Sequence, residues 1–209
     1  MRASLLKVDP LQPEPAMIRQ AAATLKRGGL VAFPTETVYG LGANLNDPQA
    51  IQELYFVKQR PFDKKVTLLI SDRRNIEQHG GQVSELARCL MERFWPGPLT
   101  LVVGREDGST IGFRMPDHPV ALALLREADV PVVAPSANLS GQPPARSAED
   151  VVRDFKDKID CILDSGETPL GQESTVVDVS GKSAIILRAA GLAEPIRQFI
   201  EDFERTSVS

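Results

Sequence analysis

Short apolar runs alternate with segments of helical periodicity along the 209 residues of the chain, and this order restricts the fold to the α/β class. Strand-length apolar runs occur at residues 5–8, 30–33, 66–70, 130–134 and 161–163. Helical periodicity occurs at residues 16–27, 48–57, 83–94, 118–128 and 147–156, and again from residue 195. Two further strand pairs, 99–103 with 111–114 and 175–179 with 184–188, flank polar turns and predict antiparallel hairpins. Such hairpins exclude a purely parallel sheet, so we expect a mixed sheet covered by helices.

Charge and composition narrow the classes of function. A net charge of −4 gives no general attraction to nucleic acid or to an anionic membrane, although it allows a local basic site. The longest unbroken apolar run, Val120–Leu125, is far shorter than a membrane span, and Lys7 and Asp9 interrupt the apolar N-terminus where a signal peptide would need continuity. Two cysteines without CxxC spacing and two isolated histidines predict neither a disulfide framework nor a zinc site. We expect one cytoplasmic domain, residues 1–209, with no membrane partner.

Three familiar motifs are incomplete in this sequence. Gly181-Lys182-Ser183 resembles the end of a P-loop, but Val176 stands where the first glycine belongs and the segment falls in a predicted hairpin turn. Gly40-Leu41-Gly42 resembles a dinucleotide fingerprint, but Leu45 replaces its third glycine. Ser136 lies in Pro-Ser-Ala-Asn rather than in Gly-x-Ser-x-Gly, so a serine triad is not indicated.

Polar residues follow several of the apolar runs. Residues 34–42, PTETVYGLG, contain hydroxyl groups that can bind a ligand and glycines that let a ligand approach the backbone closely. An ordinary turn with threonine caps explains the same residues equally well. Lys58 and Arg60 are separated by one residue and are followed by Pro61. They could clamp phosphates, or they could be solvent-exposed cations that suit the dipole at a helix C-terminus. The loop 134–144 carries Ser136, Asn138 and Ser140 between prolines and is either a nucleotide-binding loop or a surface turn.

Lone polar residues interrupt the remaining strands, at Thr110, Arg114, Ser174 and Arg188. An arginine on an apolar strand is costly unless it meets an anion or an internal carboxylate, and both remain open. We predict a pocket in which cations position a phosphoryl group and stabilise its charge; these cations are Lys58, Arg60, Arg114 and Arg188.

Seven ordered segments resemble the L-threonylcarbamoyladenylate synthase family of the YrdC/Sua5 type: PTETVYGLGAN, KQRP, WPGPLTLV, FRMPDHPV, APSANLSGQPP, ESTVVDV and ILR. The similarity runs from about residue 14 to residue 192. It implies a twisted mixed α/β sheet with flanking helices and a large concave, electropositive cavity. It also implies a nucleotidyltransferase that condenses L-threonine, bicarbonate and ATP to threonylcarbamoyl-AMP and pyrophosphate. That product feeds the t6A modification of tRNA at position 37, through t6A-transfer proteins downstream.

The resemblance also assigns roles to residues. The family's K-x-R and S-x-N residues, which hold the nucleotide phosphates, match Lys58, Arg60, Ser136 and Asn138. Further ATP contacts would be Thr110, Pro144 and Arg188, and the residues around L-threonine would be Thr35, Arg114, Ala134 and Ser174. Mg²⁺ would be held mainly by the ATP phosphates, with no protein ligand.

Some positions depart from the common family pattern. Leu69 stands where longer forms carry a histidine, and Ala189 replaces a common proline. The chain ends soon after the similar region, so we expect the short, single-domain form. The alternatives are an RNA-binding YrdC-like module, a hydrolase of the same fold, and a ribosome-maturation factor without synthase activity; the synthase itself could also bind RNA weakly. Retention of the K-x-R and S-x-N residues favours the active synthase.

Overall fold

The computed structural model describes residues 3–155 and 157–207, and its strands form one sheet in the order β1-β8-β2-β3-β7-β4-β6-β5-β9-β10. The strands are β1 (Ser4–Lys7), β2 (Val31–Phe33), β3 (Gly40–Asn44), β4 (Thr67–Leu69), β5 (Leu99–Gly104), β6 (Thr110–Arg114), β7 (Val132–Val133), β8 (Cys161–Asp164), β9 (Thr175–Asp178) and β10 (Ile185–Arg188). The sheet contains parallel pairs, such as β4/β6 and β5/β9, and antiparallel pairs, such as β2/β3 and β5/β6. The prediction of a mixed sheet is therefore confirmed.

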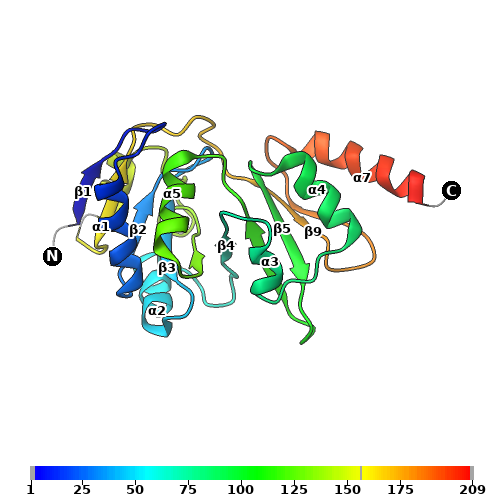
Figure 1. The fold of residues 1–209 in the computed structure, drawn as a ribbon, viewed down its shortest axis with the longest axis horizontal. Helices are drawn as coiled ribbons and strands as arrows, with labels where there is room; N and C mark the ends of the chain where they lie inside the picture. Colours follow the sequence, from blue (N-terminus) through cyan, green and yellow to red (C-terminus); the bar gives the residue numbers. More distant parts are fainter. Residues whose placement is uncertain (1–2, 156, 208–209) are drawn as a thin grey trace.

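Helices pack on the sheet around two apolar cores. They are α1 (Pro15–Lys26), α2 (Pro48–Val57), α3 (Asn75–Gln78), α4 (Glu85–Phe94), α5 (Pro119–Ala128), α6 (Ala148–Phe155) and α7 (Ala193–Ser207). Figure 1 shows α1 and α5 side by side near the N-terminal end of the sheet, and α4 with α7 at the other end. Along β2, Val31 and Phe33 face the core of α1 and α5, while Ala32 joins the larger core shared by α2, α4, α6 and α7. This alternation is what a strand between two helical layers requires.

Polar side chains begin several helices where the sequence places a capping residue. The carboxylate of Asp47 accepts hydrogen bonds from the first turn of α2, and the hydroxyl of Ser84 accepts one from the first turn of α4. Ser147 accepts from the main-chain N–H of Asp150, as the predicted capping signal before α6 indicates. His118 caps α5 through Nδ1, 3.3 Å from the N–H of Val120, so this histidine has a structural role.

Both predicted hairpins are present, as β5/β6 and β9/β10, and the Gly181-Lys182-Ser183 segment lies in the turn of the second. The sequence did not predict β3, because glycine is rare in strands. Gly42 fits there because a Cβ at this position would stand only 2.9 Å from the ring of Phe33, so close packing favours a residue without a side chain. The one-turn helix α3 was also not predicted. In the described part of the chain, no helix is both long and apolar enough to cross a membrane.

Candidate active site

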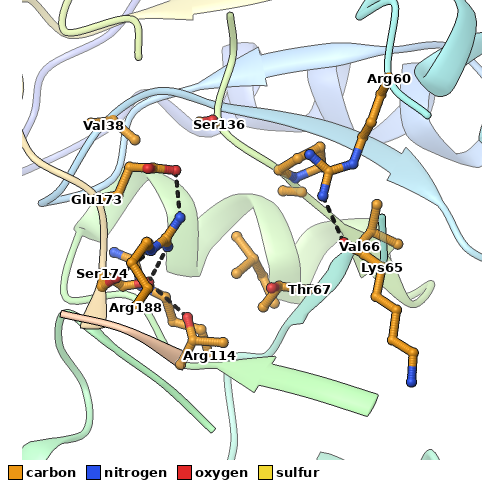
Figure 2. A pocket seen from close by; sticks show the side chains of 14 residues that line it. Val38, Arg60, Lys65, Val66, Thr67, Arg114, Ser136, Glu173, Ser174 and Arg188 are labelled. Carbon is orange, nitrogen blue, oxygen red and sulfur yellow. Dashed lines mark hydrogen bonds and ion pairs between the residues drawn. The ribbon is translucent and has the colours of Figure 1, made fainter. Parts of the chain in front are cut away.

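A polar pocket lies over the central strands, and we call it the central pocket. Its polar lining residues are Arg60, Lys65, Thr67, Thr100, Arg114, Ser136, Glu173, Ser174 and Arg188. Figure 2 shows Glu173, Ser174 and Arg188 on one side, Arg60 and Lys65 on the other, and Thr67 between them. The pocket has a volume of about 110 Å³. That is below the range of about 300–1,000 Å³ that is typical of small-molecule sites, and less room than the large cavity implied by the resemblance.

The structure brings six of the predicted site residues to the lining of the central pocket. These are Arg60, Arg114, Ala134, Ser136, Ser174 and Arg188. Five others lie outside the lining, namely Thr35, Lys58, Thr110, Asn138 and Pro144. Of these, Thr35, Lys58 and Asn138 are buried directly behind lining residues and bond to them or to their neighbours.

Arg114 is a buried cation at the end of β6. Its Nη2 lies 2.8 Å from Glu36 Oε2, and both side chains are only 9% exposed. Neither Glu36 oxygen has a partner of hydrogen-bond geometry among the described residues, so charge rather than an aligned hydrogen bond holds this pair. Arg114 also donates to Thr35 Oγ1 at 3.4 Å and to Gly97 O at 3.5 Å, which are long bonds. The guanidinium is thus held by one close ion pair and two long hydrogen bonds, and its remaining N–H donors can bind an anion.

The hydroxyl of Thr35 is held in one orientation. It donates to Val38 O at 2.7 Å, and it lies 2.8 Å from the Thr37 hydroxyl. The main-chain N–H groups of Thr37 and Val38 point to the same oxygen, at 3.2 and 3.3 Å. This turn fixes the segment that carries Glu36 beside Arg114.

A second strand arginine, Arg188 on β10, lies on the same side of the central pocket as Arg114 (Figure 2). Arg188 Nη1 donates to Glu173 Oε1 at 2.7 Å, and its Nε donates to Ser174 O at 2.9 Å. Ser174 Oγ accepts from Arg188 Nη2 at 3.2 Å and lies 2.8 Å from Thr100 Oγ1. The register shift between Ile186 and Arg188 in the β9/β10 pair accompanies this placement. Both strand arginines therefore have the internal carboxylate that the sequence left as an alternative.

Lys58 does not reach the central pocket. Its residue is 1% exposed, and its Nζ donates to Ser136 O and Asn138 O, each at 2.5 Å. Burial, followed by the nearby charge of Arg60, lowers the pKa of Lys58 to about 8. Gln59 adopts φ 50, and this left-handed turn separates Lys58, which points inward, from Arg60.

Arg60 and Lys65 form the opposite side of the central pocket. Arg60 Nη2 donates to Lys65 O at 2.7 Å, and its Nε donates to Lys64 O at 3.3 Å, so its guanidinium closes the loop 61–65. The exposed ammonium of Lys65 donates to Thr110 Oγ1 at 2.7 Å. Thr110, predicted to contact nucleotide, therefore supports a lysine at the rim.

The loop after β7 carries Ser136 into the central pocket, while Asn138 faces inward. Asn138 is 7% exposed, and its Nδ2 donates to Leu139 O at 2.9 Å and to Gln142 O at 2.7 Å. Pro144 is half-buried beyond this loop. The two members of the S-x-N pair thus have different surroundings.

Sequence reasoning missed Glu36, Glu173 and Lys65. The two glutamates stand next to predicted residues, Thr35 and Ser174, so a search for carboxylates to pair with the strand arginines would have found them. Lys65 carried no signal, because a lysine in a polar loop is ordinarily solvated.

The described residues contain no group of three or more His, Cys, Asp or Glu side chains that could hold a metal ion. The central pocket offers two carboxylates nearby, and each is paired with an arginine. This donor set does not fit a resident Mg²⁺ site, which needs carboxylate oxygens free to bind.

Comparisons with known proteins agree on one family. The Sua5/YciO/YrdC model, described as telomere recombination, matches residues 23–190. The chain is 43% identical over 196 residues to the threonylcarbamoyl-AMP synthase of Bacillus subtilis, covering 89% of this chain and 57% of that protein. It is 44% identical over 184 residues to the threonylcarbamoyl-AMP synthase of Pyrococcus abyssi, covering 84% of this chain and 54% of that protein. The crystal structure of P. abyssi Sua5 complexed with L-threonine matches at a TM-score of 0.89 and 42% identity, covering 94% of this chain and 60% of that one. The chain spans just over half the length of these two synthases.

Proposed function

The chain belongs to the Sua5/YciO/YrdC family, and from this premise we propose that it is a threonylcarbamoyl-AMP synthase. It condenses L-threonine, bicarbonate and ATP and releases pyrophosphate, which makes it a nucleotidyltransferase. The observation that carries this proposal is Arg114, a buried arginine whose hydrogen bonds are long, in a pocket that also holds small hydroxyl groups. An amino acid carboxylate is the ligand that such a guanidinium fits best.

L-threonine is a zwitterion, and the central pocket offers both signs of charge. Arg114 donates to the α-carboxylate, and Glu173, the carboxylate in the pocket lining, attracts the ammonium group. Ser174 and Thr100 add hydroxyl groups on the same side. The likeness to P. abyssi Sua5 complexed with L-threonine supports this assignment.

The triphosphate of ATP belongs on the side of Arg60 and Lys65. Lys65 is exposed and its described partner is the neutral Thr110 hydroxyl, so its charge is not cancelled by a carboxylate there. Ser136 faces the same pocket from the loop after β7. A hydroxyl and two cations are groups that bind phosphate oxygens well.

The reaction balances without a side-chain nucleophile. The threonine amine loses a proton and forms a carbamate with bicarbonate, which releases water. A carbamate oxygen then attacks the α-phosphorus of ATP, and the bond to the β-phosphate oxygen breaks as pyrophosphate leaves. The residues of the central pocket align the reactants and stabilise the charge that develops on the phosphate oxygens. Mg²⁺ would enter with ATP and would be held by its phosphates rather than by side chains of the central pocket.

Several wider roles follow from the same proposal. The product would pass to proteins that complete t6A in tRNA, and the protein would work in the cytoplasm. The RNA-binding alternative is less well supported, because Glu36 and Glu173 pair with the two arginines that would otherwise form a basic face. No contact of the described residues favours a ribosome-maturation factor.

The test is pyrophosphate release from ATP, with the adduct of AMP identified by mass spectrometry. We expect release only when L-threonine and bicarbonate are both present. Arg114→Met should abolish pyrophosphate release at L-threonine concentrations that saturate the wild type, whereas Arg126→Met, which removes an exposed arginine of α5, should behave as the wild type. Release that is indifferent to threonine and bicarbonate would refute the proposal.

A further inference from the structure

Lys58 is sealed from solvent, although the family resemblance places it on the nucleotide phosphates. It is 1% exposed and is absent from the lining of the central pocket. Two of the three donors of its ammonium group are directed at main-chain oxygens of the protein, Ser136 O and Asn138 O. An ammonium group oriented in this way faces the back of the loop rather than a ligand.

The two carbonyl groups mark the point where the loop leaves the sheet. Ala137 N–H still donates to Tyr39 O at 2.7 Å, as a strand residue would. Asn138 N–H then donates back to Ser136 O at 3.0 Å, which makes a three-residue turn. Lys58 therefore binds the loop at its turn, where the sheet no longer determines the direction of the chain.

The main chain of Lys58 holds the same loop at a second point. Its carbonyl oxygen accepts from Ser140 N–H at 2.9 Å. Within the loop, Asn138 Nδ2 donates to the carbonyl groups of Leu139 and Gln142. Polar main-chain atoms that are buried at the base of a loop need such partners, and here Lys58 and Asn138 supply them.

We infer that Lys58 is a positioning residue, which with Asn138 holds the loop 135–142 in the arrangement that presents Ser136 to the central pocket. Lys58 acts on the substrates through Ser136 and does not contact them. The effect on the loop is independent of any activity. Only the effect on turnover rests on the proposed synthase function.

The first experiment measures amide hydrogen exchange of the protein without substrates. In Lys58→Met, which keeps the length of the side chain but has no donor, exchange at Ala137, Asn138 and Ser140 should be at least tenfold faster than in the wild type. Lys65→Met is the matched control, because it removes an exposed lysine at the central pocket; exchange at these amides should stay at the wild-type rate. If Lys58→Met does not fold, Lys58→Gln, with one amide group as donor, allows the same comparison. Wild-type protection in the Lys58 variant would overturn the inference.

The second experiment measures turnover in a double-mutant cycle of Lys58→Met and Ser136→Ala. If Lys58 acts through Ser136, the double variant should be no slower than the slower single variant, and kcat should fall more than KM for ATP rises. Losses that multiply, as expected of two separate substrate contacts, would overturn the inference. A wild-type protein that releases no pyrophosphate would refute the proposed function instead, while the exchange experiment would still decide the role of Lys58.

Discussion

Removing the charge of Arg114 should destabilise the protein far more than removing an exposed arginine. Glu36 and Arg114 are each only 9% exposed at the side chain, so Arg114→Met leaves a buried carboxylate without its cation. Breaking a buried pair from one side costs about 3–5 kcal/mol, a large part of the roughly 5–15 kcal/mol that stabilises a typical domain. With a urea dependence of about 2 kcal/mol per molar, the unfolding midpoint should fall by roughly 2 M.

Urea unfolding at pH 7 measures this loss through the fluorescence of Trp95, which is the only tryptophan and is 3% exposed. Arg74→Met is the matched control, because Arg74 pairs with Asp72 at the surface and is 85% exposed at the side chain; its midpoint should stay near the wild-type value. Adding Glu36→Gln to Arg114→Met removes the unpaired charge and should recover most of the lost stability. The reasoning is refuted if Arg114→Met costs no more than Arg74→Met, or if Glu36→Gln recovers nothing.

Three further predictions concern other parts of the structure. Burial is the main reason why the pKa of Lys58 is lowered from 10.5 to about 8. Between these two pH values the unfolded chain binds more protons than the folded protein does. The free energy of unfolding therefore rises with pH, by up to about 3 kcal/mol in total. Lys58→Met should lack this rise in urea titrations from pH 7.5 to pH 10, and a constant difference from the wild type would contradict it. Gly42→Ala should destabilise by about 1–3 kcal/mol, because the new Cβ would lie 2.9 Å from the Phe33 ring; an unchanged thermal midpoint would show that β3 tolerates a side chain. Ser174→Ala removes the partner of the buried Thr100 hydroxyl. Initial-rate measurements should show KM for L-threonine raised about tenfold, equivalent to about 1.4 kcal/mol, with KM for ATP unchanged. An equal rise in both KM values would show that Ser174 does not act on L-threonine alone.

The hairpins and most helices could be predicted from the sequence because their signals are local. A polar turn such as Gly181-Lys182-Ser183 between apolar runs, or Asp47 before a helix, determines structure within a few residues. The strand β3 has no such signal. Its glycines are favourable only because Phe33 packs against Gly42, a contact that depends on the pairing of β2 with β3.

The sequence predicted many of the residues of the site, but not how they are paired and oriented. Arg114 and Arg188 were expected to meet an anion or an internal carboxylate, and their partners, Glu36 and Glu173, became known only from the fold. Lys58 and Arg60 were expected to act together, yet the left-handed turn at Gln59 sends them to different loops. Whether a lysine is buried depends on the chain that covers it, and here that chain lies 78 to 80 residues away.

The charges of the central pocket divide it into two sides with different ligands. On one side, Arg114 and Arg188 each lie beside a glutamate, so this side is nearly neutral as a whole and suits a zwitterion better than a polyanion. On the other side, the cation Lys65 is held by the neutral Thr110 hydroxyl, and Arg60 is held by main-chain carbonyl groups. Carbonyl and hydroxyl groups leave the positive charge of these cations uncancelled, so a triphosphate gains most there. An amino acid and a nucleotide placed in this way meet beside Ser136, which explains why the position of its loop matters to the proposed reaction.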